Sequence, residues 1–211
     1  MAAYCKGLAK TKTLNESNGK LPGQNEYFMA KQYPAITDKL SAFIADQKIF
    51  FVGTAAENGR VNISPKGMDS LRVINENRVV WLNVTGSGNE TSAHTQIVNR
   101  ITIMFCSFSG TPMILRLYGK VREITLADEE WSELYSLFPP MPGSRQIFDV
   151  DIDLVQTSCG MGVPFFDYSE DRDLLNNWAS SRGEDGIKDY WEESNQLSID
   201  GFQTNILKKN L

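Results

Sequence analysis

Short turns between apolar runs constrain the fold of this chain more than any other feature of its sequence. Asn58-Gly59 separates the first two runs, and this dipeptide is the strongest short-range signal for a β-hairpin. A second turn of hairpin length, Asn75-Glu76-Asn77, joins the next pair. Connections this short join antiparallel strands, because parallel strands need a crossover of a dozen or more residues. The expected strands are residues 49–56, 60–66, 71–74, 78–84, 101–106, 112–124 and 147–155.

Segments with helical spacing of apolar residues surround this series of strands. Ser87, with Glu90 three positions later, fits a capping box at the start of one helix. No glycine-rich nucleotide motif of the Rossmann or P-loop type is found. The pattern predicts a mainly β protein with peripheral helices, folded as an antiparallel barrel. The expected helices are residues 36–47, 87–100, 127–138 and 170–195.

Composition fits one globular domain with extensions at both ends. The 211 residues, 41% of them hydrophobic, suffice for a sizeable core. Residues 1–28 are rich in Lys, Thr, Asn and Gly and are expected to form a flexible arm. We expect the barrel over residues 29–165 and a helical extension, packed on the barrel, over residues 166–211.

Charge and residue counts exclude several classes of function. The net charge of −5 argues against nucleic acid, since binding the phosphate backbone needs a basic face. Three cysteines without a CxxC pair, and a single histidine, argue against a zinc site. No apolar run reaches the ~18 residues of a membrane span. We expect a soluble intracellular protein, cytoplasmic or alternatively nuclear, without a membrane partner.

Two neighbouring segments carry the groups of a phosphate site. Ser64 and Lys66 flank Pro65 at the end of a strand, and a hydroxyl and an ammonium both donate to phosphate. The Gly-rich segment 85–91 supplies Thr85, Asn89 and Thr91 at the start of a helix, where backbone N–H groups bind anions. Alternatively, the lysine is a solvated edge residue and the loop is only a helix cap. Glu90, in the first helical turn, would oppose an anion.

Four further residues are candidates for contact with a ligand. Trp81 and Asn83 share one face of a strand, because they are two positions apart. His94 could bond a ligand oxygen or transfer a proton, or it could be purely structural. Arg116 interrupts an apolar strand and could reach a phosphate or a carboxylate, or snorkel to solvent.

A row of alternating carboxylates raises the question of a metal site. Asp149, Asp151 and Asp153 lie on one face of a strand at spacings of ~6–7 Å. That spacing is too wide for one Mg²⁺ ion without other ligands, so a solvated face is predicted.

The order of these segments resembles the FMN-binding split barrels of the pyridoxamine 5'-phosphate oxidase-like family, over residues 30–165. The resemblance implies a split β-barrel that forms a homodimer with FMN at the dimer interface. It places a phosphate-binding lysine at Lys66 and a flavin-lining strand at Trp81-Leu82-Asn83. The segments that carry it are Ile49–Ala56, Val61-Asn62-Ile63-Ser64-Pro65-Lys66, Val80-Trp81-Leu82-Asn83, Arg100–Phe105 and Leu115–Lys120.

The chain departs from the family pattern at three places. Asn89-Glu90-Thr91 stands where many members have Ser-Arg-Lys, and Val61 stands where the family has a phosphate arginine. The segment Asp200–Thr204 lacks the Trp, Arg and His residues of the substrate motif of true pyridoxamine phosphate oxidases. An FMN-binding oxidoreductase with another substrate is therefore implied, without an assigned catalytic residue. The cofactor contacts are then Ser64, Lys66, Trp81, Asn83, Thr85, Asn89, Thr91, His94 and Arg116.

The departures also support an alternative on the same fold. A chain that had lost its phosphate cations could be a non-catalytic module that binds haem, a deazaflavin or pyridoxal phosphate. It could also serve only as a dimeric interaction domain.

Overall fold

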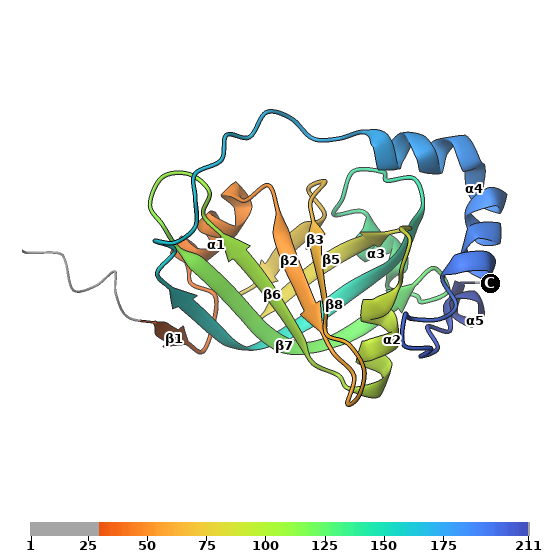
Figure 1. Ribbon diagram of the computed structural model, residues 1–211, viewed down its shortest axis with the longest axis horizontal. Helices are drawn as coiled ribbons and strands as arrows, with labels where there is room; N and C mark the ends of the chain where they lie inside the picture. The colour runs from red at the N-terminus through yellow and green to blue at the C-terminus, as the bar shows by residue number, and fades with distance from the viewer. Residues whose placement is uncertain (1–29, 211) are drawn as a thin grey trace, which may run out of the picture.

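Eight strands form one antiparallel sheet that curls into an open barrel (Figure 1). The computed structural model describes residues 30–210, so the arm expected over residues 1–28 lies outside the described residues. The strands are β1 (Lys31–Tyr33), β2 (Phe50–Thr54), β3 (Asn62–Lys66), β4 (Leu71–Asn75), β5 (Arg78–Val84), β6 (Ile101–Cys106), β7 (Ile114–Thr125) and β8 (Ser144–Ser158). The helices are α1 (Asp38–Asp46), α2 (Glu90–Ile97), α3 (Trp131–Tyr135), α4 (Leu174–Ser194) and α5 (Ile206–Asn210).

The barrel is split between two strands that are consecutive in the chain. The strand order is β3-β2-β6-β7-β8-β5-β4, with β1 added on β8. Within the described residues β3 and β4 do not pair with each other, although only residues 67–70 connect them. Pro65 lies in β3, which pairs with β2 alone, so this proline occupies an edge strand, where the missing N–H is tolerated.

Alternation along the strands places the apolar side chains in two separate cores. One fills the barrel under α1 and includes Val52, Trp81 and Phe148. The other lies on the opposite face of β5 and β8, under α3, and includes Leu82 and Ile147. The first half of β8 is therefore covered on both faces, and all residues from 145 to 150 are buried.

Three helices differ from the sequence prediction. The second begins at Glu90 rather than at residue 87, and the third has one turn where 127–138 was expected. The fourth is kinked at Gly183, whose φ of +67° is outside the helical region and is accessible to glycine. None of the helices within residues 30–210 combines the length and apolar character needed to cross a bilayer.

The carboxylate row of β8 is only partly a solvated face. Asp151 and Asp153 are exposed, as predicted. Asp149 is buried, and the prediction was wrong for this residue. Its carboxylate accepts from Nε and Nη2 of Arg78 at 2.8 and 2.9 Å, and from Nη2 of Arg122 at 3.3 Å. Two arginines on adjacent strands thus replace the solvent that alternation alone predicts.

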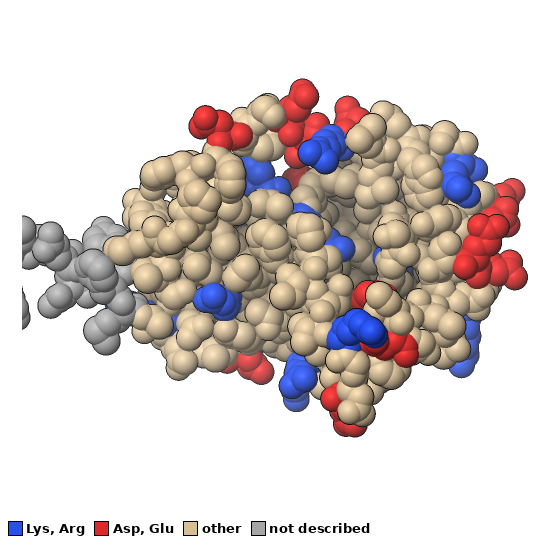
Figure 2. Space-filling model, in the orientation of Figure 1, with Lys and Arg blue, Asp and Glu red and all other residues tan. Residues whose placement is uncertain are grey.

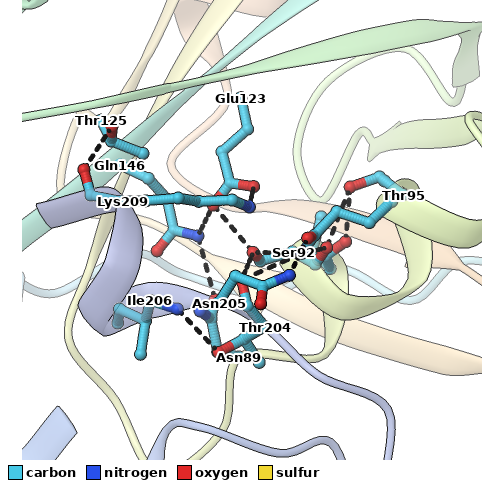
Figure 3. A network of polar contacts seen from close by, with 12 residues as sticks. Asn89, Ser92, Thr95, Glu123, Thr125, Gln146, Thr204, Asn205, Ile206 and Lys209 are labelled. Atoms are coloured by element: carbon cyan, nitrogen blue, oxygen red, sulfur yellow. Dashed lines mark hydrogen bonds and ion pairs between the residues drawn. The ribbon is translucent and has the colours of Figure 1, made fainter. Parts of the chain in front are cut away.

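A buried polar network attaches the C-terminal extension to the barrel (Figure 3). Its centre is Glu123 on β7, which accepts from Ser92 Oγ at 2.8 Å and from Gln146 Nε2 at 2.6 Å. The ammonium of Lys209 in α5 reaches the second oxygen of this carboxylate at 2.5 Å. The Thr204 carbonyl accepts from Gln96 Nε2 at 3.0 Å. These contacts place the extension beside α2, close to the split in the barrel.

Candidate functional site

A cavity of about 820 Å³ opens along the split in the barrel. Most of its lining comes from β3, β5, the loop 86–89 that leads into α2, and residues 197–199 of the C-terminal extension, and β8 adds Arg145. Figure 2 shows the molecule hollowed on this side, with Lys or Arg atoms visible at the margin of the hollow. The cavity is therefore formed by segments from both ends of the described chain.

Lys66 lies on the wall of this cavity without an anionic partner. Its ammonium sits 5.0 Å from the centre of the Trp81 ring, a cation–π contact. Burial, and secondly the positive charge of Arg145, lower the pKa of Lys66 from 10.5 to about 8. No carboxylate within residues 30–210 forms an ion pair with this ammonium. A cation held in this way is ready to accept an anion from a ligand.

Arg145 is a further cation of the cavity, and it is not among the residues predicted from the sequence. Asn83 pairs with Gln146 and Val84 pairs with Ser144, so Arg145 is the extra residue of a β-bulge in β8. A bulge redirects a side chain, and this one lines the cavity although it is only 3% exposed. Burial lowers the pKa of Arg145 to about 10, against the opposing fields of Glu123 and Tyr190. The guanidinium therefore remains protonated at neutral pH.

Within residues 30–210, the Arg145 guanidinium donates hydrogen bonds only to neutral groups. Nη1 donates to Asn195 Oδ1 at 2.6 Å, and Nη2 donates to the Gly88 carbonyl at 2.7 Å. With the Asn83 amide oxygen turned toward the guanidinium, that oxygen accepts from Nε and Nη2, each at 3.2 Å. Buried arginines usually pair with carboxylates. This one keeps an uncompensated charge at a cavity wall.

Most of the residues predicted from the sequence meet at this cavity. Asn89 is buried, and its Nδ2 has no hydrogen-bond partner among the described residues, while its Oδ1 accepts from Gln146 Nε2 at 3.1 Å. An unpaired buried donor is costly and is typical of a site that awaits a ligand or water. The predicted residues that line the cavity are Ser64, Lys66, Trp81, Asn83, Asn89 and Thr91.

The other three predicted residues lie elsewhere. Thr85 is buried and links Trp191 Nε1, at 2.8 Å, to the Gly143 carbonyl, at 2.7 Å. His94 is 1% exposed, and its Nδ1 lies 3.2 Å from Thr54 Oγ1. Arg116 lies on β7 and donates to Ser158 Oγ at 3.0 Å. None of the three is part of the cavity lining.

Glu90 has a different role from the one the sequence suggests. The capping box with Ser87 is wrong: the N-cap is Asn89, and it makes no side-chain cap bond. The Glu90 carboxylate instead accepts from the backbone N–H of Ile199, at 3.0 and 3.3 Å. This contact spans 109 positions, so no local pattern could indicate it. The carboxylate thus holds the C-terminal wall of the cavity.

The chemistry of the cavity changes between its interior and its rim. Lys66 and Arg145 supply positive charge inside, whereas Val61, just before β3, and Ile63 on β3 are each 69% exposed. Leu197 and Ile199 of the C-terminal extension add exposed apolar surface to the lining. Such an arrangement fits a ligand with an anionic group at one end and an apolar body at the other.

Known proteins resemble this chain in sequence and in structure. The family model described as pyridoxamine 5'-phosphate oxidase matches residues 36–159. A pyridoxamine 5'-phosphate oxidase family protein of Aspergillus flavus is 34% identical over 190 residues, which cover 81% of this chain and 76% of that protein.

Solved structures resemble this chain more distantly. One is a pyridoxamine 5'-phosphate oxidase-related, FMN binding protein from Nostoc punctiforme, with 14% identity and a TM-score of 0.39 over 52% of this chain and 73% of that one. Another is HupZ of Group A Streptococcus, with 16% identity and a TM-score of 0.45 over 56% and 91% of the two chains.

Proposed function

The chain belongs to the pyridoxamine 5'-phosphate oxidase family, and from this premise we propose that it binds FMN in the cavity along the split and acts as an FMN-dependent oxidoreductase. One observation carries the proposal. Two cations, the half-buried Lys66 and the buried Arg145, reach the wall of one cavity without a carboxylate partner among the described residues.

The residues present fit the two chemical halves of this cofactor. The FMN phosphate is a dianion, and a charge-assisted hydrogen bond to it is roughly twice as strong as a neutral one. Lys66 and Arg145 would hold that phosphate, and the Asn89 Nδ2 donor would find an acceptor. The apolar rim around Val61 and Ile63 suits a flat aromatic ring system. The bound flavin would supply the redox chemistry, while this chain positions it and excludes water.

The departures from the family pattern are compatible with this proposal. Glu90 lines the cavity and keeps its negative charge, but its carboxylate is bonded to the backbone N–H of Ile199 on the C-terminal wall. Arg145 reaches the cavity from a bulge in β8 and supplies a cation that the segment 89–91 lacks. The charge requirement is thus met by a different part of the chain.

We further propose that the working unit is a homodimer. A second hollow, of about 520 Å³, lies on the outer faces of β2, β6 and β7. Val61 and Ile63 line both hollows, so a second copy that covers β3 would close both at once. Exposed apolar side chains beside an unpaired strand edge are typical of association surfaces.

The haem alternative is less well supported. Haem would need an axial ligand, and His94 is the only imidazole in the chain. Its ring is buried beside Thr54 and Phe202 and does not line the cavity. A flavin needs no such ligand, so the observed cations favour it.

The proposal is tested by loading the purified protein with excess FMN, desalting it and recording the visible spectrum. We expect a retained band near the flavin's roughly 450 nm absorbance, at one flavin per subunit, and quenching of tryptophan fluorescence. Lys66→Met should weaken FMN binding at least about tenfold, since it removes a charge-assisted contact. Lys39→Met, which changes an exposed lysine of α1, is the matched control. Wild-type protein without a band or quenching would contradict the proposal.

A further inference from the structure

Asn195 stands where a carboxylate would be the ordinary partner of Arg145. The side chain is fully buried at the C-terminal end of α4. Its Oδ1 accepts from Nη1 of Arg145 at 2.6 Å, and its Nδ2 donates to the Gly86 carbonyl at 3.0 Å. Both ends of the amide are therefore used, which fixes its orientation and that of the guanidinium.

Glu123, the carboxylate whose charge acts on Arg145, is committed to other donors. The negative charge of Glu123 raises the pKa of Arg145, but the carboxylate makes no hydrogen bond to the guanidinium. Its oxygens accept from Ser92 and Gln146 on one side and from Lys209 on the other. The charge of Arg145 is therefore balanced neither by Asn195 nor by direct contact with Glu123.

We propose that Asn195 is a positioning residue that holds the Arg145 guanidinium against the cavity while leaving its positive charge for the anionic group of a ligand. This inference rests on the proposed function and extends it, because it makes the C-terminal extension part of the anion site. An aspartate at this position would orient the guanidinium equally well but would neutralise it. The neutral amide therefore orients the guanidinium without neutralising its charge.

Two substitutions separate these two roles of Asn195. Asn195→Asp and Asn195→Ala both remove the Nδ2 donor to Gly86. They differ in the group that faces Arg145, which is a carboxylate in the first variant and a methyl group in the second. Asn195→Asp places a carboxylate on a buried cation and should melt at a higher temperature than Asn195→Ala. The same carboxylate competes with a ligand anion, so Asn195→Asp should bind inorganic phosphate at least about tenfold more weakly than Asn195→Ala. Calorimetric titration with inorganic phosphate and thermal melts measure both quantities.

The diagnostic result is an inversion between the two variants: Asn195→Asp is the more stable one but binds phosphate more weakly. If Asn195 were merely structural, the more stable variant would also bind phosphate better, and that outcome would overturn the inference. Titration with FMN in parallel distinguishes the two proposals. Wild-type protein that binds phosphate but not FMN, with the inversion intact, would retain the role of Asn195 and reject FMN as the cofactor. Wild-type protein that binds FMN, with no inversion between the two variants, would support FMN as the cofactor and reject the role of Asn195. Wild-type protein that binds neither phosphate nor FMN would reject both proposals.

Discussion

Lys66 occupies a position that costs stability when no anion is present. Its folded pKa of about 8 lies below the unfolded value of 10.5, so the folded state disfavours the charged form. Between these two pH values the unfolded chain binds more protons than the folded one. The free energy of unfolding therefore rises with pH across this window. Below pH 8 the folded protein bears the full cost of burying the charged ammonium.

Lys66→Met should accordingly stabilise the ligand-free protein at pH 7. We expect a gain of about 1–3 kcal/mol, because a shift of one pKa unit corresponds to about 1.4 kcal/mol. The gain should shrink as the pH rises from about 8 to 10.5. Urea unfolding at pH 7 and pH 10 measures the difference, with Lys39→Met as the exposed control. A gain that does not change with pH, or a loss at pH 7, would show that the ammonium is already compensated.

Of the two cations, Lys66 was predicted from the sequence and Arg145 was not. Lys66 was identified because a lysine after a strand and a proline is visible in the sequence. Arg145 was missed because its direction depends on a bulge, which is created by the register between β5 and β8. A basic residue at the start of an otherwise apolar strand was the one available signal.

At the scale of elements, the helical extension is attached to the barrel by buried polar contacts. The Lys209–Glu123 ion pair joins α5 to β7, and the two side chains are 25% and 10% exposed. Both partners are largely shielded from water, so removing one of them leaves a poorly solvated charge and costs more than breaking a surface salt bridge.

Lys209→Met should destabilise the protein by about 1–2 kcal/mol, because the Glu123 carboxylate is left with only its two neutral donors. For a chain of this size that corresponds to a fall in Tm of roughly 2–8 °C. Lys208→Met is the matched control, since this neighbouring lysine is exposed and should change stability by less than about 0.5 kcal/mol. Thermal melts of the two variants side by side provide the test. Equal Tm values would mean that the pair does not hold the extension.

At the scale of the whole molecule, the split between β3 and β4 leaves both an unpaired edge and an open cavity. Ile63→Lys places a charge in the exposed apolar surface that borders both hollows. We expect this variant to raise the dimer dissociation constant at least about tenfold, since charges are disfavoured at the centre of an interface. Light scattering during size-exclusion chromatography measures it. Leu137→Lys, at an exposed leucine after α3, is the control. A wild-type monomer at high concentration would rule the homodimer out.

The sequence by itself determined the type of sheet, the hairpins and six of the residues that line the cavity. These features depend on period, turn chemistry and near neighbours, all of which are local. Only the tertiary structure decided that Glu90 bonds Ile199 and that Asn195 orients Arg145, across 109 and 50 positions. It also decided that His94 is enclosed. Such contacts arise where separate elements pack together. The neighbours of a charged side chain in the sequence do not determine its direction or its partner, whereas the packing of the elements does.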